Sequence, residues 1–332
     1  MPTASVPVSA RAARAARAAT ASVVAGIGLA GSVSPALGAR LAFPLFMRVG
    51  PRTPVARADR ATHESARRGT VRIPGLRRTG VDVVTYEWGR GDETVVLAHG
   101  WQSRASVFAT LVRELRSEGF HVVAFDAPAN GDSPGRGTYL VDHLDTIGEL
   151  QQRHGRFHGI VGHSFGALAA LMAVHDGIDA RRVVSVAGAA SPQVFIEGFG
   201  DLLRLDRATR DALARRFARR LFPGGLDPFE RYSAAEHPLA EGTHLLLVHD
   251  RDDRRVPFTE SERLLEVNAP TARLVVTEGF GHNRVLRADV TLDAVTAFLA
   301  APDGAIDAVP AHVEQAVSQP LGGTGAAADS MS

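Results

Sequence analysis

The sequence contains no cysteine among its 332 residues, so disulfides, thiolate metal ligands and cysteine-borne lipids are excluded. It also lacks an excess of charge of either sign. Its 37 basic and 36 acidic residues leave a net charge of +1, which argues against a nucleic-acid partner. Neither the phosphate-loop pattern G-x-x-x-x-G-K-[ST] nor a strand-linked G-x-G-x-x-G occurs, and the 13 histidines show no zinc-ligand spacing. We therefore predict no cofactor and no metal.

What the sequence does contain is a repeated alternation of short apolar runs and helical patterns. The run 94–98 (TVVLA) is typical of a strand buried on both faces, and residues 106–117 follow it with helical spacing. The strands predicted before residue 190 are 81–88, 94–98, 121–125, 159–162 and 183–187, and the helices are 106–117, 141–153 and 167–175. This alternation predicts an α/β fold with a mostly parallel sheet and helices on both faces.

The alternation breaks after residue 190 and returns near residue 243. Helical patterns with many arginines fill 195–220, and 222–238 is irregular. The rhythm resumes with predicted strands at 244–248 and 273–276 and a last helix at 291–299. We therefore expect one core, 48–190 and 243–300, interrupted by a small helical cap insertion, 191–242. Four apolar residues of the insertion are expected to face the site beneath it: Leu203, Leu205, Leu213 and Phe217.

The two ends of the chain differ from this core. Residues 301–332 are rich in Ala, Gly, Ser and Pro without apolar periodicity, which predicts a flexible tail. In the lead-in, 1–47, three arginines precede a mostly apolar stretch, 21–39, as in a secretory signal, but glycine, serine and proline interrupt that stretch. We expect a loosely ordered lead-in followed by a docking helix near 35–47, in a cytoplasmic protein. A spanning helix and a cleaved signal are the alternatives, which would make the protein membrane-associated or exported.

The strongest local motif is the pentapeptide Gly162-His163-Ser164-Phe165-Gly166. It follows a predicted strand and precedes an alanine- and leucine-rich helix, as a nucleophile elbow requires. Glycines at both ends of such a turn permit the close approach of backbone segments, which lifts the serine hydroxyl clear of the sheet. The motif predicts Ser164 as a catalytic nucleophile, with Gly162 and Gly166 supporting the elbow.

A second motif, His99-Gly100-Trp101, follows the buried strand 94–98. Acyl transfer develops negative charge on the carbonyl oxygen, and two preorganised backbone N–H groups are the usual stabiliser. We expect these donors to be the N–H of Trp101 and that of Phe165, next to the nucleophile. His99 and Gly100 are expected to support the loop.

These motifs occur in an order that resembles the α/β-hydrolase superfamily. His99-Gly100-Trp101 comes first, D-A-P-A-N-G-D-S (126–133) second and the serine pentapeptide third, and the order is most similar to the bacterial esterase- and lipase-like members. The resemblance covers about 72–299. It implies that Asp126 shapes its loop, with a direct catalytic role as the alternative.

The resemblance also implies the partners of the serine. The family places its histidine last, before the final helix, and the glycine-rich segment E-G-F-G-H-N-R puts His282 there as the base. The acid follows the penultimate strand, and the family pattern of an acid, two variable residues and Val-Pro selects Asp253. Asp250 and Asp252 are the alternatives for the acid.

The function expected from these residues is hydrolysis of carboxylic esters through an acyl-enzyme, without a cofactor. Thioester, amide or carbon–carbon hydrolysis on the same triad, and a non-catalytic binding protein with this fold, are the alternatives. The expected partner is a small ester whose apolar acyl or alcohol group lies near Trp101, Phe165, Phe195 and Phe199. A membrane surface, met through the N-terminus, is a further candidate partner.

Overall fold

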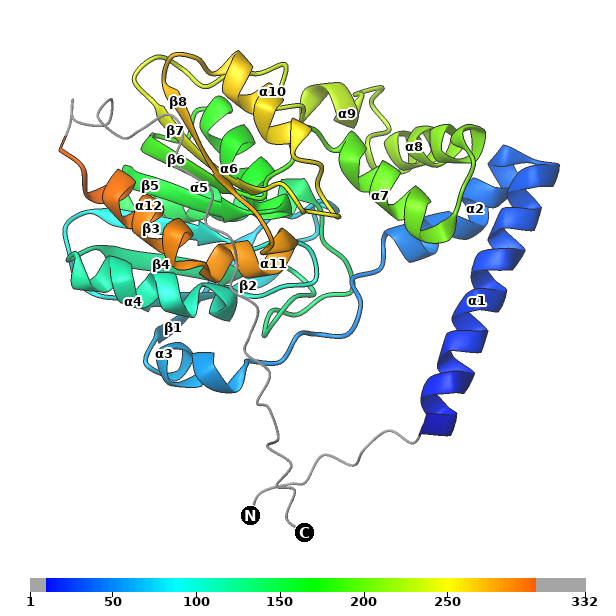
Figure 1. The fold of residues 1–332 in the computed structure, drawn as a ribbon, viewed down its shortest axis with the longest axis horizontal. Helices are drawn as coiled ribbons and strands as arrows, with labels where there is room; N and C mark the ends of the chain where they lie inside the picture. Colours follow the sequence, from blue (N-terminus) through cyan, green and yellow to red (C-terminus); the bar gives the residue numbers. More distant parts are fainter. Residues whose placement is uncertain (1–9, 303–332) are drawn as a thin grey trace, which may run out of the picture.

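The computed structural model describes residues 10–302, with side chains from residue 21 onward, and its centre is one eight-stranded sheet (Figure 1). The expected tail, apart from its first two residues, lies outside the described residues. The strands run in the order β1-β2-β4-β3-β5-β6-β7-β8. Their bounds are β1 (Arg67–Ile73), β2 (Val81–Trp88), β3 (Thr94–Ala98), β4 (His121–Asp126), β5 (Phe157–His163), β6 (Ala180–Val186), β7 (His244–Asp250) and β8 (Ala272–Thr277).

The sheet is parallel from β4 to β8, and only β2 is antiparallel to its neighbours β1 and β4. The prediction of a mostly parallel sheet is therefore confirmed. The helices are α1 (Ala10–Val33), α2 (Pro35–Phe46), α3 (Arg60–Glu64), α4 (Ala109–Ser117), α5 (Leu140–His154), α6 (Phe165–His175), α7 (Gln193–Leu203), α8 (Arg207–Leu221), α9 (Pro228–Arg231), α10 (Thr259–Val267), α11 (Gly281–Arg284) and α12 (Asp289–Ala300).

The central strands are apolar throughout because both of their faces are covered. Side chains of successive strand residues point to opposite faces, so Val95 and Leu97 pack with α4 and α12, while Val96 and Ala98 pack with α5 and α6. Every residue of β3 and of β5 is buried. The helices packed on both faces of the sheet hold the carboxyl ends of the parallel strands in place, and the site described below lies at these ends.

The sequence did not predict four helices and strands of the core, namely β1, α10 and the short helices α3 and α11. Strand β1 was not predicted because it lies at the edge of the sheet and has a short apolar pattern. Of its seven residues, R-R-G-T-V-R-I, only Val71 and Ile73 are buried. Helix α10 begins directly after the loop at Pro257, in a stretch to which the sequence reading assigned no element. Of the four, only α11 lies in a segment that carries a functional motif, since it contains His282.

The stretch 191–242 holds α7, α8 and α9, and the N-terminal helices pack against it (Figure 1). Helix α2 occupies the place expected for a docking helix, and α1 gives most of the lead-in a regular helical form. Leu203, Leu205 and Leu213 pack in a cluster with Ile27 and Ala39 of these helices. The expectation that these three leucines face the site is therefore wrong, because α1 and α2 offer them an apolar surface on the other side. Among residues 10–302, no helix combines the length and apolar character that crossing a bilayer requires.

Candidate active site

Ser164 lies at the sharp turn between β5 and α6, in a strained backbone conformation. Its φ of 56° and ψ of −121° lie outside the regions that residues with a side chain favour. The flanking glycines make the turn possible. A Cβ on Gly162 would lie 2.3 Å from the Cα of Ala167, and one on Gly166 would lie 2.1 Å from the backbone oxygen of Ala98. The turn therefore holds the Ser164 side chain at the carboxyl end of the sheet, next to the first turn of a buried helix.

His282 lies in the short helix α11 and faces the serine. Its Nε2 is 2.9 Å from the Ser164 Oγ, and its Nδ1 is 2.7 Å from an Asp253 carboxylate oxygen. Because a carboxylate can only accept, Nδ1 carries the proton and Nε2 is left as an acceptor for the serine hydroxyl. All three side chains are buried, so these contacts are little weakened by water.

The three candidate aspartates have different partners in the structure. Asp250 accepts hydrogen bonds from the Thr277 hydroxyl and from the N–H groups of Phe280 and Gly281, so it holds the loop that leads to His282. Asp252 accepts from the N–H of Gly279. Among the three, only Asp253 contacts the imidazole.

The environment of Asp253 keeps this carboxyl ionised. Burial by itself raises the pKa of Asp253, but hydrogen bonds from His249 and His282, together with the charge of His282, outweigh burial and hold the pKa well below its ordinary value. The N–H groups of Arg255 and Val256 donate to the other carboxylate oxygen, at 2.8 and 3.1 Å. These bonds fix the carboxylate on the far side of the imidazole from Ser164.

His163 and His249 are two further histidines at this site that the sequence reading did not assign. The Nε2 of His163 lies 2.9 Å from the backbone oxygen of His282, and His249 Nε2 lies 3.4 Å from Asp253. Burial, helped by the neighbouring His282, lowers the pKa of His163 to about 4, so the ring is neutral and Nε2–H donates. No sequence motif marks either contact. The contact of His163 depends on how two separate loops meet, whereas His249 and Asp253 are four residues apart.

The loop 99–101 lies directly beside the serine. An added Cβ on Gly100 would be 3.0 Å from the Ser164 Cβ, so only glycine fits here without a shift of its neighbours. His99 fixes the loop: its Nδ1 is 2.7 Å from the Gly100 oxygen, and its Nε2 accepts from the N–H of Ala127. Burial lowers the pKa of His99, which keeps the ring neutral as this pair of bonds requires.

Two backbone N–H groups adjoin the serine without a protein acceptor. Within the described chain, the N–H groups of Trp101 and Phe165 form no hydrogen bond, the second because it belongs to the first turn of α6. The Trp101 and Phe165 rings pack at 5.8 Å, and Phe195 of α7 lies 5.1 Å from Phe165. Three of the four expected apolar residues therefore adjoin one another. Phe199 instead packs against Phe46 of α2, at 5.2 Å.

Asp126 is fully buried and bound by other groups. It accepts hydrogen bonds from the N–H groups of Ala105 and Asp132 and from the hydroxyl of Tyr86. These contacts join the loop after β4 to the loop after β3. They agree with the expected loop-shaping role of Asp126.

A trio of potential metal ligands lies at the opposite end of the sheet. One ligand atom each from Glu87, His121 and His154 falls within 4.8 Å of the others. His121 begins β4, whereas Ser164 follows the end of β5, so the trio is remote from the serine. The sequence did not reveal it because its members come from three distant elements. Arg67 already forms an ion pair with Glu87 there.

Comparison with known proteins agrees with this architecture. Residues 95–320 match the sequence profile of the alpha/beta hydrolase family. Among solved structures, an esterase from Pyrococcus furiosus is 23% identical with a TM-score of 0.54, covering 76% of this chain and 96% of its own. A monoacylglycerol lipase from Paleococcus ferrophilus is 23% identical with a TM-score of 0.50 (66% and 98% covered). Mouse alpha/beta hydrolase domain-containing protein 10 is 17% identical with a TM-score of 0.54 (74% and 100%). At these identities the structures show a shared fold.

Proposed function

Because the chain belongs to the alpha/beta hydrolase family, we propose that it is a serine hydrolase that cleaves carboxylic esters through Ser164, His282 and Asp253. One observation carries the proposal. A continuous hydrogen-bonded chain runs from the Ser164 hydroxyl through both nitrogens of His282 to the ionised Asp253, at 2.9 and 2.7 Å. A serine hydroxyl becomes a nucleophile when such a base can take its proton, and the carboxylate stabilises the imidazolium that forms.

The proposed reaction has two halves. The Ser164 Oγ attacks the acyl carbon while its proton moves to Nε2 of His282, and the N–H groups of Trp101 and Phe165 stabilise the oxyanion. His282 then gives the proton to the leaving alcohol as the ester C–O bond breaks. Water attacks the acyl-enzyme in the same way: His282 removes its proton, the acid is released and the proton returns to Ser164.

The ester substrate is supported by the apolar surroundings of the serine. Trp101, Phe165 and Phe195 form a cluster of aromatic rings that includes the residue after the nucleophile, which suits an apolar acyl or alcohol group. The esterase and lipase among the structural neighbours support the same substrate class. Hydrolysis of thioesters, amides or carbon–carbon bonds by the same residues is the alternative reaction. The non-catalytic alternative is a binding protein that has this fold but does not use the three residues for catalysis.

The proposal is tested by hydrolysis of p-nitrophenyl esters from acetate to palmitate. Wild type and Ser164→Ala are compared, with Ser191→Ala as a matched control, since Ser191 is also a buried serine but lies outside the hydrogen-bonded chain. We expect turnover in the wild type and the control, a fall of at least about 10³-fold in Ser164→Ala, and a preferred chain length that measures the acyl site.

The opposite outcome is equally informative. If the folded wild type is no faster than Ser164→Ala on every ester, ester hydrolysis is wrong. Thioester, anilide and β-diketone substrates then separate the alternative chemistries. Activity on none of them favours the binding protein.

A further inference from the structure

Two neighbouring strands and one helix bring a carboxylate and two imidazoles together at the end of the sheet remote from Ser164. Glu87 of β2 lies opposite Val123 of β4, which places it two positions from His121 on one face of the sheet. Helix α5 packs on this face and ends at His154. One ligand atom from each of the three lies within 4.8 Å of the others. The Glu87 and His121 side chains are 12% and 13% exposed, so the cluster lies below the surface.

The orientation of His121 suits a metal ligand. Its Nδ1 lies 3.2 Å from the hydroxyl of Thr94, its neighbour on β3, and its Nε2 lies 3.3 Å from Oε2 of Glu87. With a proton on Nδ1 donated to Thr94, the lone pair of Nε2 points toward the carboxylate. Metal-bound histidines are usually held in this way, by a hydrogen bond from the nitrogen that does not bind the ion.

His154 supplies a nitrogen that the protein leaves without a partner. Among the described residues neither of its ring nitrogens forms a hydrogen bond, although Nε2 is buried. Buried polar atoms of native proteins are nearly always bonded, so an unbonded one indicates a partner that the chain itself does not supply. Burial also lowers the pKa of His154, against the opposing effect of Glu87, so the ring is neutral at pH 7 and has a lone pair to offer.

The distances and the ligand types fit zinc. In a tetrahedral site with ligands about 2.0–2.1 Å from the ion, two ligand atoms lie about 3.3–3.4 Å apart, as those of Glu87 and His121 already do. A small rotation of His154, at the end of its helix, completes the set. Two imidazoles favour zinc over magnesium and calcium, which prefer oxygen ligands. A hollow of about 520 Å³, lined in part by Glu87 and His121, gives water access to the fourth position.

The positive charges nearby oppose a cation. Arg67 of β1 forms an ion pair with Oε2 of Glu87, and Arg90 and Arg116 also line the hollow. The Arg67 side chain is 75% exposed, and an exposed ion pair adds little stability, so Arg67 can turn into solvent. Oε1 of Glu87 has no hydrogen-bond or ion-pair partner within residues 10–302. We therefore expect an exchangeable ion rather than a permanently held one.

We propose that Glu87, His121 and His154 form a zinc site, with water as the fourth ligand, that joins the end of α5 to strands β2 and β4. The site departs from the prediction of no metal made from the sequence, since no spacing along the chain connects its ligands. A bound ion should stabilise the native chain, because the unfolded chain does not hold the three ligands together.

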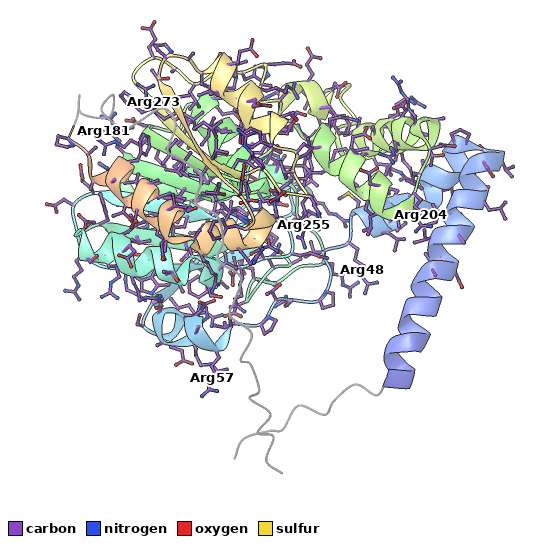
Figure 2. The ribbon with its side chains drawn as sticks, viewed as in Figure 1. Arg48, Arg57, Arg181, Arg204, Arg255 and Arg273 are labelled. Atoms are coloured by element: carbon purple, nitrogen blue, oxygen red, sulfur yellow. The ribbon has the colours of Figure 1, made fainter. Side chains whose placement is uncertain are left out.

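The zinc site and the candidate active site lie at opposite ends of the parallel strands. Figure 2 shows this separation: Arg181 and Arg273, near the starts of β6 and β8, lie at one end of the sheet, and Arg255, two residues after Asp253, lies at the other. His121 begins β4 and so belongs to the first end. We therefore expect zinc to act on stability rather than on the reacting atoms, and the proposal stands whether or not the enzyme cleaves esters.

The test is calorimetric titration of the full chain with zinc chloride, after EDTA has been used and removed, together with thermal melts with and without zinc. The variants are Glu87→Gln, His154→Gln and Arg67→Gln. The control is His175→Gln. His175 is also the last residue of a helix, and its ring stacks on that of His237 at 4.5 Å, but among the described residues no carboxylate completes that pair.

We expect one zinc ion per chain, and a higher melting temperature with zinc, for the wild type and the control. Glu87→Gln and His154→Gln should bind zinc at least about tenfold more weakly, since even outer partners of metal ligands contribute that much. Arg67→Gln should bind zinc about fivefold more tightly, because the competing cation is gone.

Three results would overturn the proposal. One is a wild type that does not bind zinc one to one. The second is wild-type zinc affinity in the folded Glu87→Gln or His154→Gln variant, or an equal loss of affinity in His175→Gln. The third is weaker binding by Arg67→Gln, which decides the matter even if a ligand variant fails to fold.

Discussion

The imidazole of His163 donates a hydrogen bond to the backbone oxygen of His282 at 2.9 Å, so the residue that precedes the nucleophile holds the loop of the base. The two rings also lie 5.0 Å apart. This contact joins the elbow after β5 to the loop after β8. His163 thus ties the loop of the base to the elbow, although within the described residues its ring forms no hydrogen bond with the Ser164 hydroxyl.

From this contact we predict that His163 is a positioning residue. His163→Ala leaves a buried carbonyl without its donor, and kcat should fall about tenfold with little change in KM. His163→Gln retains an N–H donor and should restore most of the rate. Steady-state kinetics on one soluble ester measure both variants. Equal kcat values for wild type and His163→Ala would show that the contact has no effect on catalysis.

A second prediction concerns stability at acid pH. Burial lowers the pKa of His143 to about 3 and that of His163 to about 4, from an ordinary value of 6.5. Below pH 6.5 the unfolded chain binds protons at these residues while the native chain does not, so the free energy of unfolding falls as the pH falls toward 4. Each histidine contributes a slope of about 1.4 kcal/mol per pH unit in that window.

Urea unfolding at several pH values between 7 and 4.5 measures this slope. His143→Gln removes one titrating group, and its slope should be smaller than that of the wild type by up to about 1.4 kcal/mol per pH unit. Parallel pH dependence in the two proteins would mean that His143 is protonated in the native state.

The backbone strain at Ser164 gives a third prediction. A positive φ is costly for serine and alanine but not for glycine, so Ser164→Gly should unfold with a free energy about 1 kcal/mol higher than Ser164→Ala. Both variants should lack hydrolytic activity. Chemical denaturation compares them directly, and a less stable glycine variant would indicate that the turn is not strained in solution.

A fourth prediction separates the aspartates of the loop after β7. Asp253→Asn should lower kcat by about 10⁴-fold, because the amide favours the wrong imidazole tautomer. It should also lower stability, because the buried carboxylate accepts hydrogen bonds from two N–H groups and from His282. Asp250→Asn should mainly lower stability, by about 1–3 kcal/mol, since it weakens a buried set of bonds to the loop that leads to His282. Kinetics and melting of the two variants decide between these roles. If Asp250→Asn is less active than Asp253→Asn, then Asp250 is the catalytic acid and Asp253 has the structural role.

The sheet and the order of its elements were predictable from the sequence because the buried strands have a strong local signature. Runs such as 94–98 are apolar throughout, and each is followed by helical spacing. Edge strand β1 has no such run, because only Val71 and Ile73 of its seven residues are buried, although it pairs with the next strand along the chain, β2. Local pattern thus predicts the strands that are buried on both faces and misses those that are not.

The candidate site was predictable only where a motif is local. The glycines around Ser164 report the steric demands of one turn, which a single sequence can show. The bonds of Asp250 to Gly281 and of His163 to His282 join segments that are 31 and 119 residues apart, so no local spacing predicts them. The placement of Leu203 and Leu213 failed for a related reason: the sequence shows that they are apolar, but not which of two apolar surfaces they cover.

The central claim is that Ser164 is a nucleophile activated by His282, and covalent labelling tests it most directly. Wild type, Ser164→Ala and His282→Ala are treated with a fluorophosphonate and their intact masses are measured, followed by peptide mapping. The account predicts one adduct per chain, located on Ser164, absent in Ser164→Ala and formed far more slowly in His282→Ala. A folded wild type that remains unlabelled, or that is labelled at another residue, would contradict it.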